Sequence, residues 1–321
     1  KASNYTLAGG AHKADIARAT IATIGGITAQ NRTYDGTTDA VLSTAAADFA
    51  GKVAGDELTV AAATGAFADK KAGSGKSVAI SGLALGGADA ANYILADDTA
   101  TTTADIARAA IAAITGITGI DRVYDGTTAA ALDLSAATFA GKVAGDVLTV
   151  ASATGAFADK KAGTGRAVAI SGLTLAGADA GNYVLADTTA ATSADIARAT
   201  ISAITGITAA GRTYDGTAVA GLDTASAGFA GMIAGDALTV ASATGAFADK
   251  KAGTGKAVAI SGLSLGGADA DNYLLASTTA ATSANIGKAT ISAITDIAGI
   301  DRIYDGTTVA GLDTASAGFA G

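Results

Sequence analysis

Residues 147–157 read Val-Leu-Thr-Val-Ala-Ser-Ala-Thr-Gly-Ala-Phe, and the polar segment Ala-Asp-Lys-Lys-Ala-Gly-Thr-Gly follows at 158–165. Within 148–153, larger apolar residues alternate with polar or small ones, as expected for a strand with one buried face. The alanine content alone favours helix, but frequent threonine, valine and glycine argue against it. The stretch therefore predicts a β-strand followed by a polar loop.

The same segments recur along the chain with a fixed period. Thr-Gly-Ala-Phe-Ala-Asp-Lys-Lys-Ala-Gly begins at Thr64, Thr154 and Thr244, so the period is 90 residues (154 − 64 and 244 − 154). A repeat of this kind shows how the chain is organised, so it is established before any local pattern is interpreted. By a convention of phase, we place complete repeat units at 14–103, 104–193 and 194–283, the C-terminal tail of a preceding repeat at 1–13, and the N-terminal part of a further repeat at 284–321.

One unit contains several short strand signals separated by turn residues. In the second unit we expect a helical turn within 136–141, a weak strand around 128–134, and clearer strands at 110–114, 118–124, 147–157, 167–175 and 183–186. Asp125-Gly126 favours a hairpin, because glycine adopts positive φ without steric cost. The predicted fold class is all-β: a tandem array of ~90-residue domains resembling a small β-sandwich or β-grasp. A solenoid is the competing architecture, but its coils repeat every 20–50 residues or so and no shorter period is visible.

Composition excludes several classes of function. The 321 residues include no cysteine, which excludes disulfides, thiolate metal sites and thiol nucleophiles. His12 is the only histidine, which excludes a multi-histidine metal site and disfavours a histidine-based triad. The net charge of −8 argues against nucleic-acid binding. Charged residues interrupt every apolar stretch before it reaches the length of a transmembrane helix, so we expect no membrane insertion.

Two motifs recur in every copy that is long enough to contain them, and both have a ligand-binding and a structural interpretation. We favour structure. For Tyr-Asp-Gly this is a tight turn with a packed tyrosine whose hydroxyl finds a backbone partner, and for the segment that ends in Asn-Tyr it is a polar loop whose Asp and Asn bond nearby backbone amides. The Tyr-Asp-Gly residues are Tyr34, Asp35, Gly36, Tyr124, Asp125, Gly126, Tyr214, Asp215, Gly216, Tyr304, Asp305 and Gly306, and the Asn-Tyr residues are Asn92, Tyr93, Asn182, Tyr183, Asn272 and Tyr273.

Recurrent aspartates raise the question of calcium, whose sites need six to eight oxygen ligands. The candidates are Asp15, Asp35, Asp56 and Asp89, but no Asp-x-Asp-x-Asp-Gly loop occurs and Asp15 becomes Asn285 in the last copy. We therefore expect no cofactor, with Ca²⁺ as the minor alternative. The glycine-rich loop at 73–76 lacks the phosphate-loop spacing. Glu57 is the only glutamate, and Val147 and Ala237 stand at the equivalent positions of the next two repeats. A catalytic carboxylate would be expected in every copy, so this position does not indicate a glycoside hydrolase.

Four ordered motifs resemble those of the YDG repeat. They are Tyr-Asp-Gly-Thr, Gly-Asp-x-Leu-Thr-Val, Asp-Lys-Lys-Ala-Gly-Thr-Gly-Lys and Gly-Ala-Asp-Ala-x-Asn-Tyr-x-Leu, and together they span essentially the whole chain. The YDG repeat and the related MBG domains occur in very large secreted proteins of Gram-negative bacteria, many of them similar to filamentous haemagglutinins. The resemblance implies a β-rich repeat in a secreted, extracellular or cell-surface protein, and it carries no catalytic residues to transfer.

We therefore expect a structural, non-enzymatic role: the repetitive stalk of a secreted bacterial adhesin or a biofilm-matrix fibre. The expected partners are neighbouring repeats of the same chain, with self-association into fibres and contact with a host or matrix glycan or protein as further expectations. The alternative is a multivalent carbohydrate- or protein-binding module of the cell surface, in which repetition supplies avidity. Such a module requires exposed aromatic or polar clusters in every copy, and only the two tyrosine motifs qualify.

Overall fold

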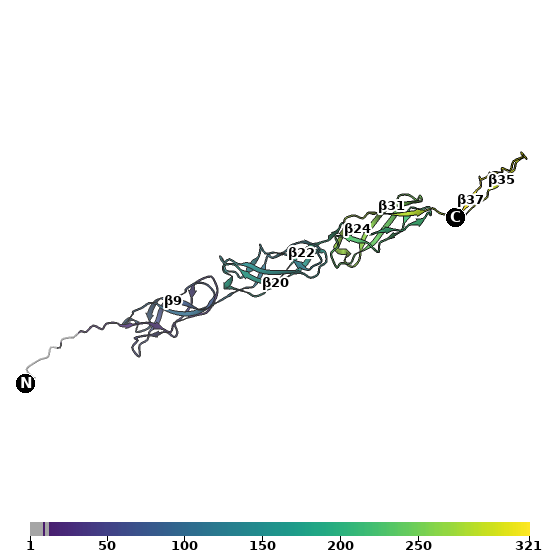
Figure 1. Cartoon of the computed structure of the whole chain (residues 1–321). Helices are drawn as coiled ribbons and strands as arrows, with labels where there is room; N and C mark the ends of the chain where they lie inside the picture. The colour runs from purple at the N-terminus through teal and green to yellow at the C-terminus, as the bar shows by residue number, and fades with distance from the viewer. Residues whose placement is uncertain (1–8, 10–12) are drawn as a thin grey trace, which may run out of the picture. The chain divides into compact units, whose positions relative to one another are not determined.

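The computed structural model describes residue 9 and residues 13–321, and this part of the chain is all-β (Figure 1). Its only helical elements are three short 3₁₀ turns, η2 (Ala90–Asn92), η3 (Ala180–Asn182) and η4 (Ala270–Asn272). Within the described residues, no helix has the length and apolar character needed to cross a membrane. The Asn4-Tyr5 pair and His12 of the tail at 1–13 lie outside the described residues.

Each complete repeat contributes the same succession of strands. The first repeat contains β1 (Ala19–Ile21), β2 (Ile24–Gly25), β3 (Thr28–Ala29), β4 (Arg32–Thr33), β5 (Asp39–Ala40), β6 (Leu42–Ser43), β7 (Asp48–Phe49), β8 (Thr59–Phe67), β9 (Gly73–Gly86), β10 (Tyr93–Leu95) and β11 (Ala100–Ala107). The second contains β12 (Ala109–Ile111), β13 (Ala113–Thr115), β14 (Thr118–Gly119), β15 (Arg122–Val123), β16 (Ala129–Ala130), β17 (Leu132–Asp133), β18 (Thr138–Ala140), β19 (Thr149–Phe157), β20 (Gly163–Ala176), β21 (Tyr183–Leu185) and β22 (Ala190–Ala197). The third contains β23 (Ala199–Ile201), β24 (Ala203–Thr205), β25 (Thr208–Ala209), β26 (Arg212–Thr213), β27 (Val219–Ala220), β28 (Leu222–Asp223), β29 (Gly228–Ala230), β30 (Thr239–Phe247), β31 (Gly253–Gly266), β32 (Tyr273–Leu275) and β33 (Ala280–Gly287).

A five-stranded sheet is the main element of each repeat. In the first repeat its order is β4-β11-β9-β8-β5, with β9 antiparallel to both β8 and β11 and β4 parallel to β11. Three two-stranded ladders accompany the sheet: β1 with β10 in parallel, and β2 with β7 and β3 with β6 in antiparallel pairing. The third repeat has the same arrangement in β23–β33.

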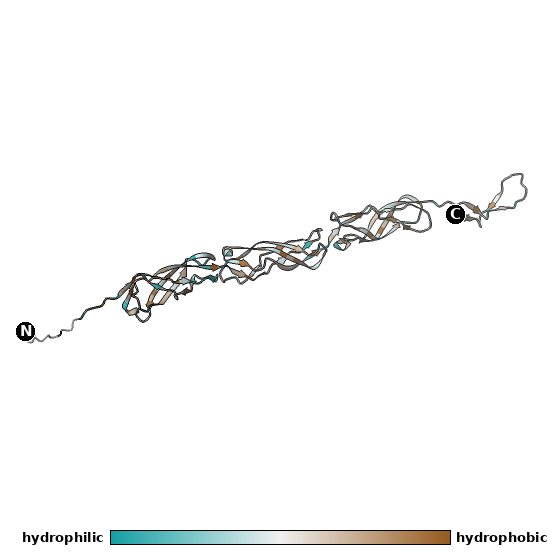
Figure 2. Cartoon of the chain, turned by 90° about the horizontal axis from the view of Figure 1, so that it is seen from below, coloured by the Kyte–Doolittle hydropathy of each residue, from teal (hydrophilic) through white to brown (hydrophobic). Residues whose placement is uncertain are grey.

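The hydrophobic core lies between the long strands and the short ladders. In the first repeat, Ile21 and Ile24 from the ladders pack in one cluster with Ile80 and Leu83 of β9. Alternate residues of the long strands point into this core because strand side chains alternate between faces. Figure 2 shows the resulting mixture of hydrophobic and hydrophilic residues along the strands.

The predicted long strands are confirmed. Those expected at 147–157, 167–175 and 183–186 correspond to β19, β20 and β21, although β20 begins within the predicted polar loop. The segments at 110–114 and 118–124 are each broken into two short strands. The helical turn within 136–141 is wrong, because β18 occupies it and pairs with β13 through Ile114 and Phe139. Alanine propensity was overruled there by strand pairing.

The hairpin predicted at the Tyr-Asp-Gly turn is also wrong. In the first repeat this turn joins β4 to β5, which are the two opposite edges of the five-stranded sheet. Only residues 34–38 separate them, and Asp35 folds this link by accepting hydrogen bonds from Thr37. Because so short a link joins the outermost strands, the sheet must curl until its edges approach each other. The turn thus closes a curled sheet, in which β4 pairs with the last two residues of β11 and β5 pairs with two residues near the end of β8.

By its contacts the chain divides into two compact units. The first comprises 1–118, 132–155 and 169–192, and the second comprises 119–131, 156–168 and 193–321. The division runs through the second repeat, so each unit contains one whole junction between consecutive repeats. In the first unit β11 ends at Ala107 and β12 begins at Ala109, which leaves a single residue between the last strand of one repeat and the first strand of the next.

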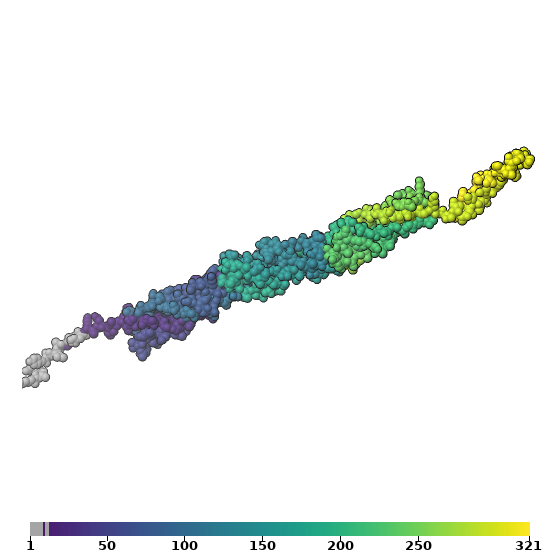
Figure 3. All heavy atoms as spheres, viewed as in Figure 1, coloured from purple at the N-terminus to yellow at the C-terminus, as the bar shows by residue number. Residues whose placement is uncertain are grey.

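The incomplete fourth copy has only β34 (Ala293–Thr295), β35 (Ala298–Ile300), β36 (Gly311–Asp313) and β37 (Gly318–Ala320). These strands form two ladders, β34 with β37 and β35 with β36. Its apolar side chains are exposed, among them Ile291, Ile294 and Phe319. Figure 3 shows this segment, in yellow, as a narrow strip of atoms. The contrast indicates that the long strands supply the core against which the short ladders pack.

Candidate functional site

The most distinctive polar cluster lies between consecutive repeats, around one buried carboxylate. Asp146 is 3% exposed, and its Oδ2 atom accepts hydrogen bonds from two tyrosine hydroxyls. Tyr34 from the preceding repeat donates at 2.8 Å, and Tyr183 from the same repeat as Asp146 donates at 2.6 Å. The Tyr183 hydroxyl also accepts the backbone N–H of Val143 at 2.9 Å. A single carboxylate therefore joins two repeats.

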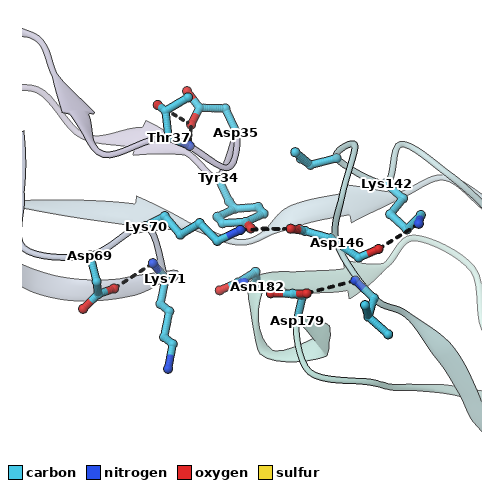
Figure 4. Close-up of polar contacts among 12 residues, drawn as sticks. Tyr34, Asp35, Thr37, Asp69, Lys70, Lys71, Lys142, Asp146, Asp179 and Asn182 are labelled. Carbon is cyan, nitrogen blue, oxygen red and sulfur yellow. Dashed lines mark hydrogen bonds and ion pairs between the residues drawn. The ribbon is translucent and has the colours of Figure 1, made fainter.

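Two further polar contacts cross this junction, and Figure 4 shows the first of them, from Lys70 to Asp146. The Lys70 Nζ atom lies 3.1 Å from Asp146 Oδ1. The backbone N–H of Ala72 donates to Asn182 Oδ1 at 3.0 Å. On the Asp146 side, Lys142 donates to the backbone carbonyl of Asp146 at 2.8 Å, which fixes the loop that presents the carboxylate. The buried charge is thus paired and its oxygens are satisfied, as stability requires.

We name the two sides by their residues. The tyrosine face comprises Tyr34, Gly36, Lys70 and Ala72 of one repeat and their equivalents at +90 and +180. The aspartate face comprises Val53, Asp56, Asn92 and Tyr93 and their equivalents, which in the second repeat are Val143, Asp146, Asn182 and Tyr183.

The second junction, in the second unit, repeats this chemistry. Asp236 Oδ2 accepts from Tyr124 at 2.8 Å and from Tyr273 at 2.6 Å. Lys160 lies 2.7 Å from Asp236 Oδ1, and it also reaches Asp269 at 3.8 Å. The N–H of Ala162 donates to Asn272 at 3.0 Å. The arrangement is therefore a property of the repeat.

Apolar packing surrounds the shared carboxylate. The rings of Tyr34 and Tyr183 meet edge to face, with centroids 5.5 Å apart and planes at 77°, a favourable aromatic geometry. Gly36 has φ +83°, and a Cβ there would lie 2.8 Å from Cγ1 of Val143. Glycine is thus required at position 36 for two reasons: its backbone conformation and the close approach of the next repeat. One hydrophobic cluster runs through the junction and includes Phe67, Tyr34, Ile111 and Tyr183.

Ionisation in the first junction follows from these contacts. Burial alone would raise the pKa of Asp146, but hydrogen bonds from Tyr183, Tyr34 and Lys70 outweigh it and lower the pKa below its ordinary value. Burial, followed by the hydrogen bond to Asp146, raises the pKa of Tyr183 to about 12. The hydrogen bond to Asp146 raises the pKa of Lys70 to about 12. Near neutral pH the cluster therefore holds one carboxylate, one ammonium and two neutral phenols.

Local contacts within the Tyr-Asp-Gly turn position the tyrosine. Arg32 donates to Asp35 at 2.8 Å and to Thr37 Oγ1 at 2.8 Å, and its guanidinium lies 5.1 Å from the centroid of the Phe67 ring. The same arginine–aspartate–threonine contacts occur in the fourth copy at Arg302, although that copy lacks the long strands. The turn is therefore formed by local sequence, while the place of its tyrosine depends on what packs against it.

The predicted motif residues fall into covered and uncovered groups. Tyr34 and Tyr124 are buried in the two junctions, Tyr214 is 40% exposed and Tyr304 is 92% exposed. Their aspartates and glycines form the turns described above. Asn182 and Asn272 accept hydrogen bonds across the junctions. Tyr183 and Tyr273 donate to the same carboxylates as the turn tyrosines of the preceding repeats. In the first repeat Asn92 is exposed, and Tyr93 is buried and donates to Asp56. The expected backbone partner of the turn tyrosine is instead a carboxylate of the next repeat.

The calcium candidates are not brought together as a ligand set. Asp15 is exposed, Asp35 binds its own turn, Asp56 accepts from the Tyr93 hydroxyl at 2.5 Å, and Asp89 accepts the Glu57 N–H at 2.8 Å. No group of three or more residues able to hold a metal ion occurs in the described part of the chain. In the glycine-rich loop, the Gly75 N–H donates to Asp105 at 2.7 Å, so a carboxylate occupies the position a phosphate would need.

Sequence reasoning missed the partners of the tyrosines. Lys70 and Asp146 were not among the candidate site residues, although Asp56, its equivalent in the first repeat, was considered for calcium. The feature of the sequence that could have identified the aspartate is its presence in every repeat. It recurs at 56, 146 and 236, while the next residue changes from Glu57 to Val147 to Ala237. Tyr34 and Asp146 are 112 residues apart, which no local pattern connects.

The lowered pKa of Asp146 and of its counterpart Asp236 makes junction stability depend on pH. A depressed carboxyl pKa stabilises the fold above the ordinary value of about 3.9, and this contribution is lost as pH falls through the depressed pKa. We expect the thermal unfolding midpoint, measured by circular dichroism between neutral pH and about pH 2, to fall below about pH 4. The double variant Asp146→Asn/Asp236→Asn should show a flatter profile. Parallel profiles would contradict a role for the shared carboxylates.

These features define a class: a tandem array of β-domains in which a shared buried carboxylate joins the first repeat to the second and the second to the third. The chain belongs to the YDG domain family, whose profile matches residues 18–103, 108–191 and 197–281. No curated protein matches its sequence. Among solved structures it is similar to three N-terminal domains of the bacteriophage RB49 highly immunogenic outer capsid protein (Hoc), at 10% identity, covering 85% of this chain and 100% of that chain, with a TM-score of 0.22. A likeness at that score carries no argument about this chain.

Proposed function

We propose that this chain is a structural repeat segment of a secreted bacterial surface adhesin or biofilm-matrix fibre, in which YDG repeats serve as a stalk. The observation that carries the proposal is the duplicated junction, in which Asp146 and Asp236 each bind the tyrosine and lysine of the preceding repeat. This site recurs at both junctions, and its polar groups form bonds with residues of the neighbouring repeat. Such a site supports a role in joining domains. The cell-surface location is part of the proposal and rests on the resemblance of the YDG motifs.

The junction contacts support a defined step from one repeat to the next. A linker of one residue, Arg108, allows little freedom, and hydrogen bonds, an ion pair and ring packing restrain what remains. Stability of such an array is a sum of repeat and nearest-neighbour terms. Each added repeat therefore brings its own core and one further junction.

The test is the dependence of molecular dimension on repeat number. Small-angle scattering on this chain, and on a version in which residues 104–193 are duplicated, should give a maximum dimension that grows by one constant step per repeat. The double variant Asp146→Ala/Asp236→Ala should broaden the distribution of distances without changing the dimensions of single repeats. Equal dimensions for both chain lengths would contradict a stalk.

The proposed multivalent binding module finds less support in the geometry. Its candidate contacts were the recurring tyrosines, but Tyr34, Tyr124, Tyr183 and Tyr273 are turned into the junctions and buried or bonded there. Binding of the intact chain to immobilised glycans with an affinity that rises with repeat number would favour the module over the stalk.

A further inference from the structure

The initial segment of each repeat, from β1 to β4, pairs in parallel with its final segment, from β10 to β11. In the first repeat β1 pairs with β10, and Ala19 lies opposite Tyr93. At the other end of the two segments β4 pairs with β11, and Arg32 lies opposite Ile106. Both pairs have the same offset of 74 residues (93 − 19 and 106 − 32). The two segments therefore keep one register at both of their ends.

The same offset of 74 residues occurs in the other two complete repeats. The opposed residues are Ala109 and Tyr183, Arg122 and Ile196, Ala199 and Tyr273, and Arg212 and Ile286. The parallel pairing is therefore part of the repeat itself. It involves only residues inside 14–283, so it does not depend on the partial copies on either side.

Backbone hydrogen bonds extend both pairs beyond the strands. At one end of the first repeat the Ala96 N–H donates to the Ile21 carbonyl at 2.9 Å, and at the other end the Tyr34 N–H donates to the Ala107 carbonyl at 2.8 Å. Between these ends the initial segment pairs with β7 and β6 instead. The initial and final segments are thus fastened to each other at two places, one at each end.

Chain connectivity sets the direction in which tension loads these pairs. The chain enters the first repeat at β1 and leaves it at β11, and only Arg108 separates β11 from β12 of the next repeat. Tension along the array therefore pulls β1 toward its N-terminal end and β11 toward its C-terminal end. Because their partners β10 and β4 run parallel to them, this pull acts along the strands and across the hydrogen bonds. In that geometry the bonds of one pair carry the load together and must break together.

We propose that the two parallel pairs form a mechanical clamp that keeps each repeat folded while the stalk carries tension. The pair of β1 with β10 holds the initial segment, and the pair of β4 with β11 holds the final segment. This inference rests on the proposed function, because a stalk transmits load from one repeat to the next. It goes further by assigning that load to named strands. Resistance to forced unfolding depends on the rate of unfolding, so it can be measured separately from equilibrium stability.

Single-molecule force spectroscopy on the full chain tests the clamp by changing the direction of pulling. Handles at the two chain ends should give one unfolding event per complete repeat. Each event should lengthen the chain by about 250 Å, because about 90 residues extend to roughly 3.3–3.6 Å each and the folded initial segment already spans about 50 Å.

A second attachment pulls the same protein in an unzipping direction. Glu57→Cys and Ala88→Cys place handles beside the paired residues Thr59 and Gly86, at one end of the antiparallel strands β8 and β9, in a chain that has no other cysteine. Pulling there separates the strands one hydrogen bond at a time, so the first repeat should open at a lower force than it does from the chain ends. Equal forces in the two directions would overturn the inference.

Proline substitutions test the clamp with the handles kept at the chain ends. The clamp variant removes the N–H that closes the first pair in every complete repeat, by Ala96→Pro, Ala186→Pro and Ala276→Pro. The matched control removes one N–H per repeat from the link between the two longest strands, by Ala68→Pro, Ala158→Pro and Ala248→Pro. All six alanines are exposed. Urea unfolding should show similar losses of stability for both variants. At a fixed force the clamp variant alone should unfold about two- to tenfold faster, and equal rates for the two variants would contradict the clamp.

A natural difference between the repeats supplies a test by gain of strength. The Asp105 N–H donates to Asn31 Oδ1 at 2.8 Å, and Asp121 accepts the equivalent bond in the second repeat. The third repeat has Gly211 at this position and so has no side chain to accept the bond. A Cβ there would come no closer than 3.5 Å to any atom outside the adjacent residues. Gly211→Asn should therefore move one unfolding event to higher force, whereas the control Gly221→Asn, outside the clamp, should move none. Three unmoved events in Gly211→Asn would count against the clamp.

The two proposals fail separately. If the pulling direction and the clamp variants leave the unfolding force unchanged while the maximum dimension still grows with repeat number, the clamp is wrong and the stalk stands. If the dimension does not grow with repeat number, the proposed function is wrong, whatever force a single repeat resists.

Discussion

Replacing Asp146 with alanine should lower the free energy of unfolding by about 3 kcal/mol, about half of it within the second repeat and about half in the coupling between the first and second repeats. The substitution leaves the hydroxyls of Tyr34 and Tyr183 without their shared acceptor, and each hydrogen bond to a charged group is worth about 1.5 kcal/mol or more. Lys70 loses its ion pair but is partly exposed and can turn to water, so we assign no further cost to it. Urea unfolding curves fitted to a nearest-neighbour scheme measure this quantity.

Asp56→Ala is the matched control, because Asp56 is the same residue in the first repeat and lacks the preceding tyrosine in the described structure. Within the described residues, its carboxylate accepts a hydrogen bond from the Tyr93 hydroxyl and from no second tyrosine, so the expected loss is about 1.5 kcal/mol, confined to the first repeat. Hydrogen exchange should show Asp146→Ala accelerating exchange on both sides of the junction. Equal losses for the two variants would contradict the role of Asp146 as a shared acceptor.

Phe67→Ala should destabilise the first repeat by about 4 kcal/mol. Phe67 is 3% exposed at the end of β8, and truncation of a buried phenylalanine to alanine costs about 3–5 kcal/mol. The Arg32 guanidinium would also lose the ring on which it stacks, a contact worth about 0.5–1 kcal/mol. Because Arg32 holds the turn at Asp35 and Thr37, we expect faster hydrogen exchange at residues 34–38 as well.

Two controls accompany this variant. Phe67→Leu keeps an apolar side chain of similar volume and should cost less than half as much as alanine. Phe319→Ala removes an exposed phenylalanine of the fourth copy and should change stability by less than about 0.5 kcal/mol. Exchange at 34–38 that stays unchanged in Phe67→Ala would show that the turn does not depend on the ring beneath it.

The period of 90, the all-β class and the long strands could be predicted from sequence because they depend on local alternation and on exact repetition. The turn at Asp125-Gly126 could be predicted as a turn but not as the link between opposite sheet edges. Positive φ at Gly126 identifies a tight bend, and strand order is set by partners far along the chain. The same limit produced the helical turn predicted at 136–141, where β18 is held by pairing with β13.

The candidate site was predictable in its residues and not in its contacts. Tyr34 and Tyr183 were identified from recurrence, yet their meeting at Asp146 depends on how one repeat packs on the next. An aspartate that persists beside a changing neighbour signals a constrained role, but a turn, a metal ligand and a junction acceptor all produce that pattern. Only three-dimensional placement separates these roles.

The fixed separation of junction partners has an evolutionary consequence. Tyrosine and carboxylate lie 112 residues apart in both junctions, which is one period of 90 plus 22. A recombination event that removes or inserts a whole period therefore reunites a tyrosine with an aspartate at the same separation. The number of repeats can change during replication, and every new pair of neighbouring repeats still has the same tyrosine and carboxylate at its junction. The length of such a gene product can therefore change without the evolution of a new contact.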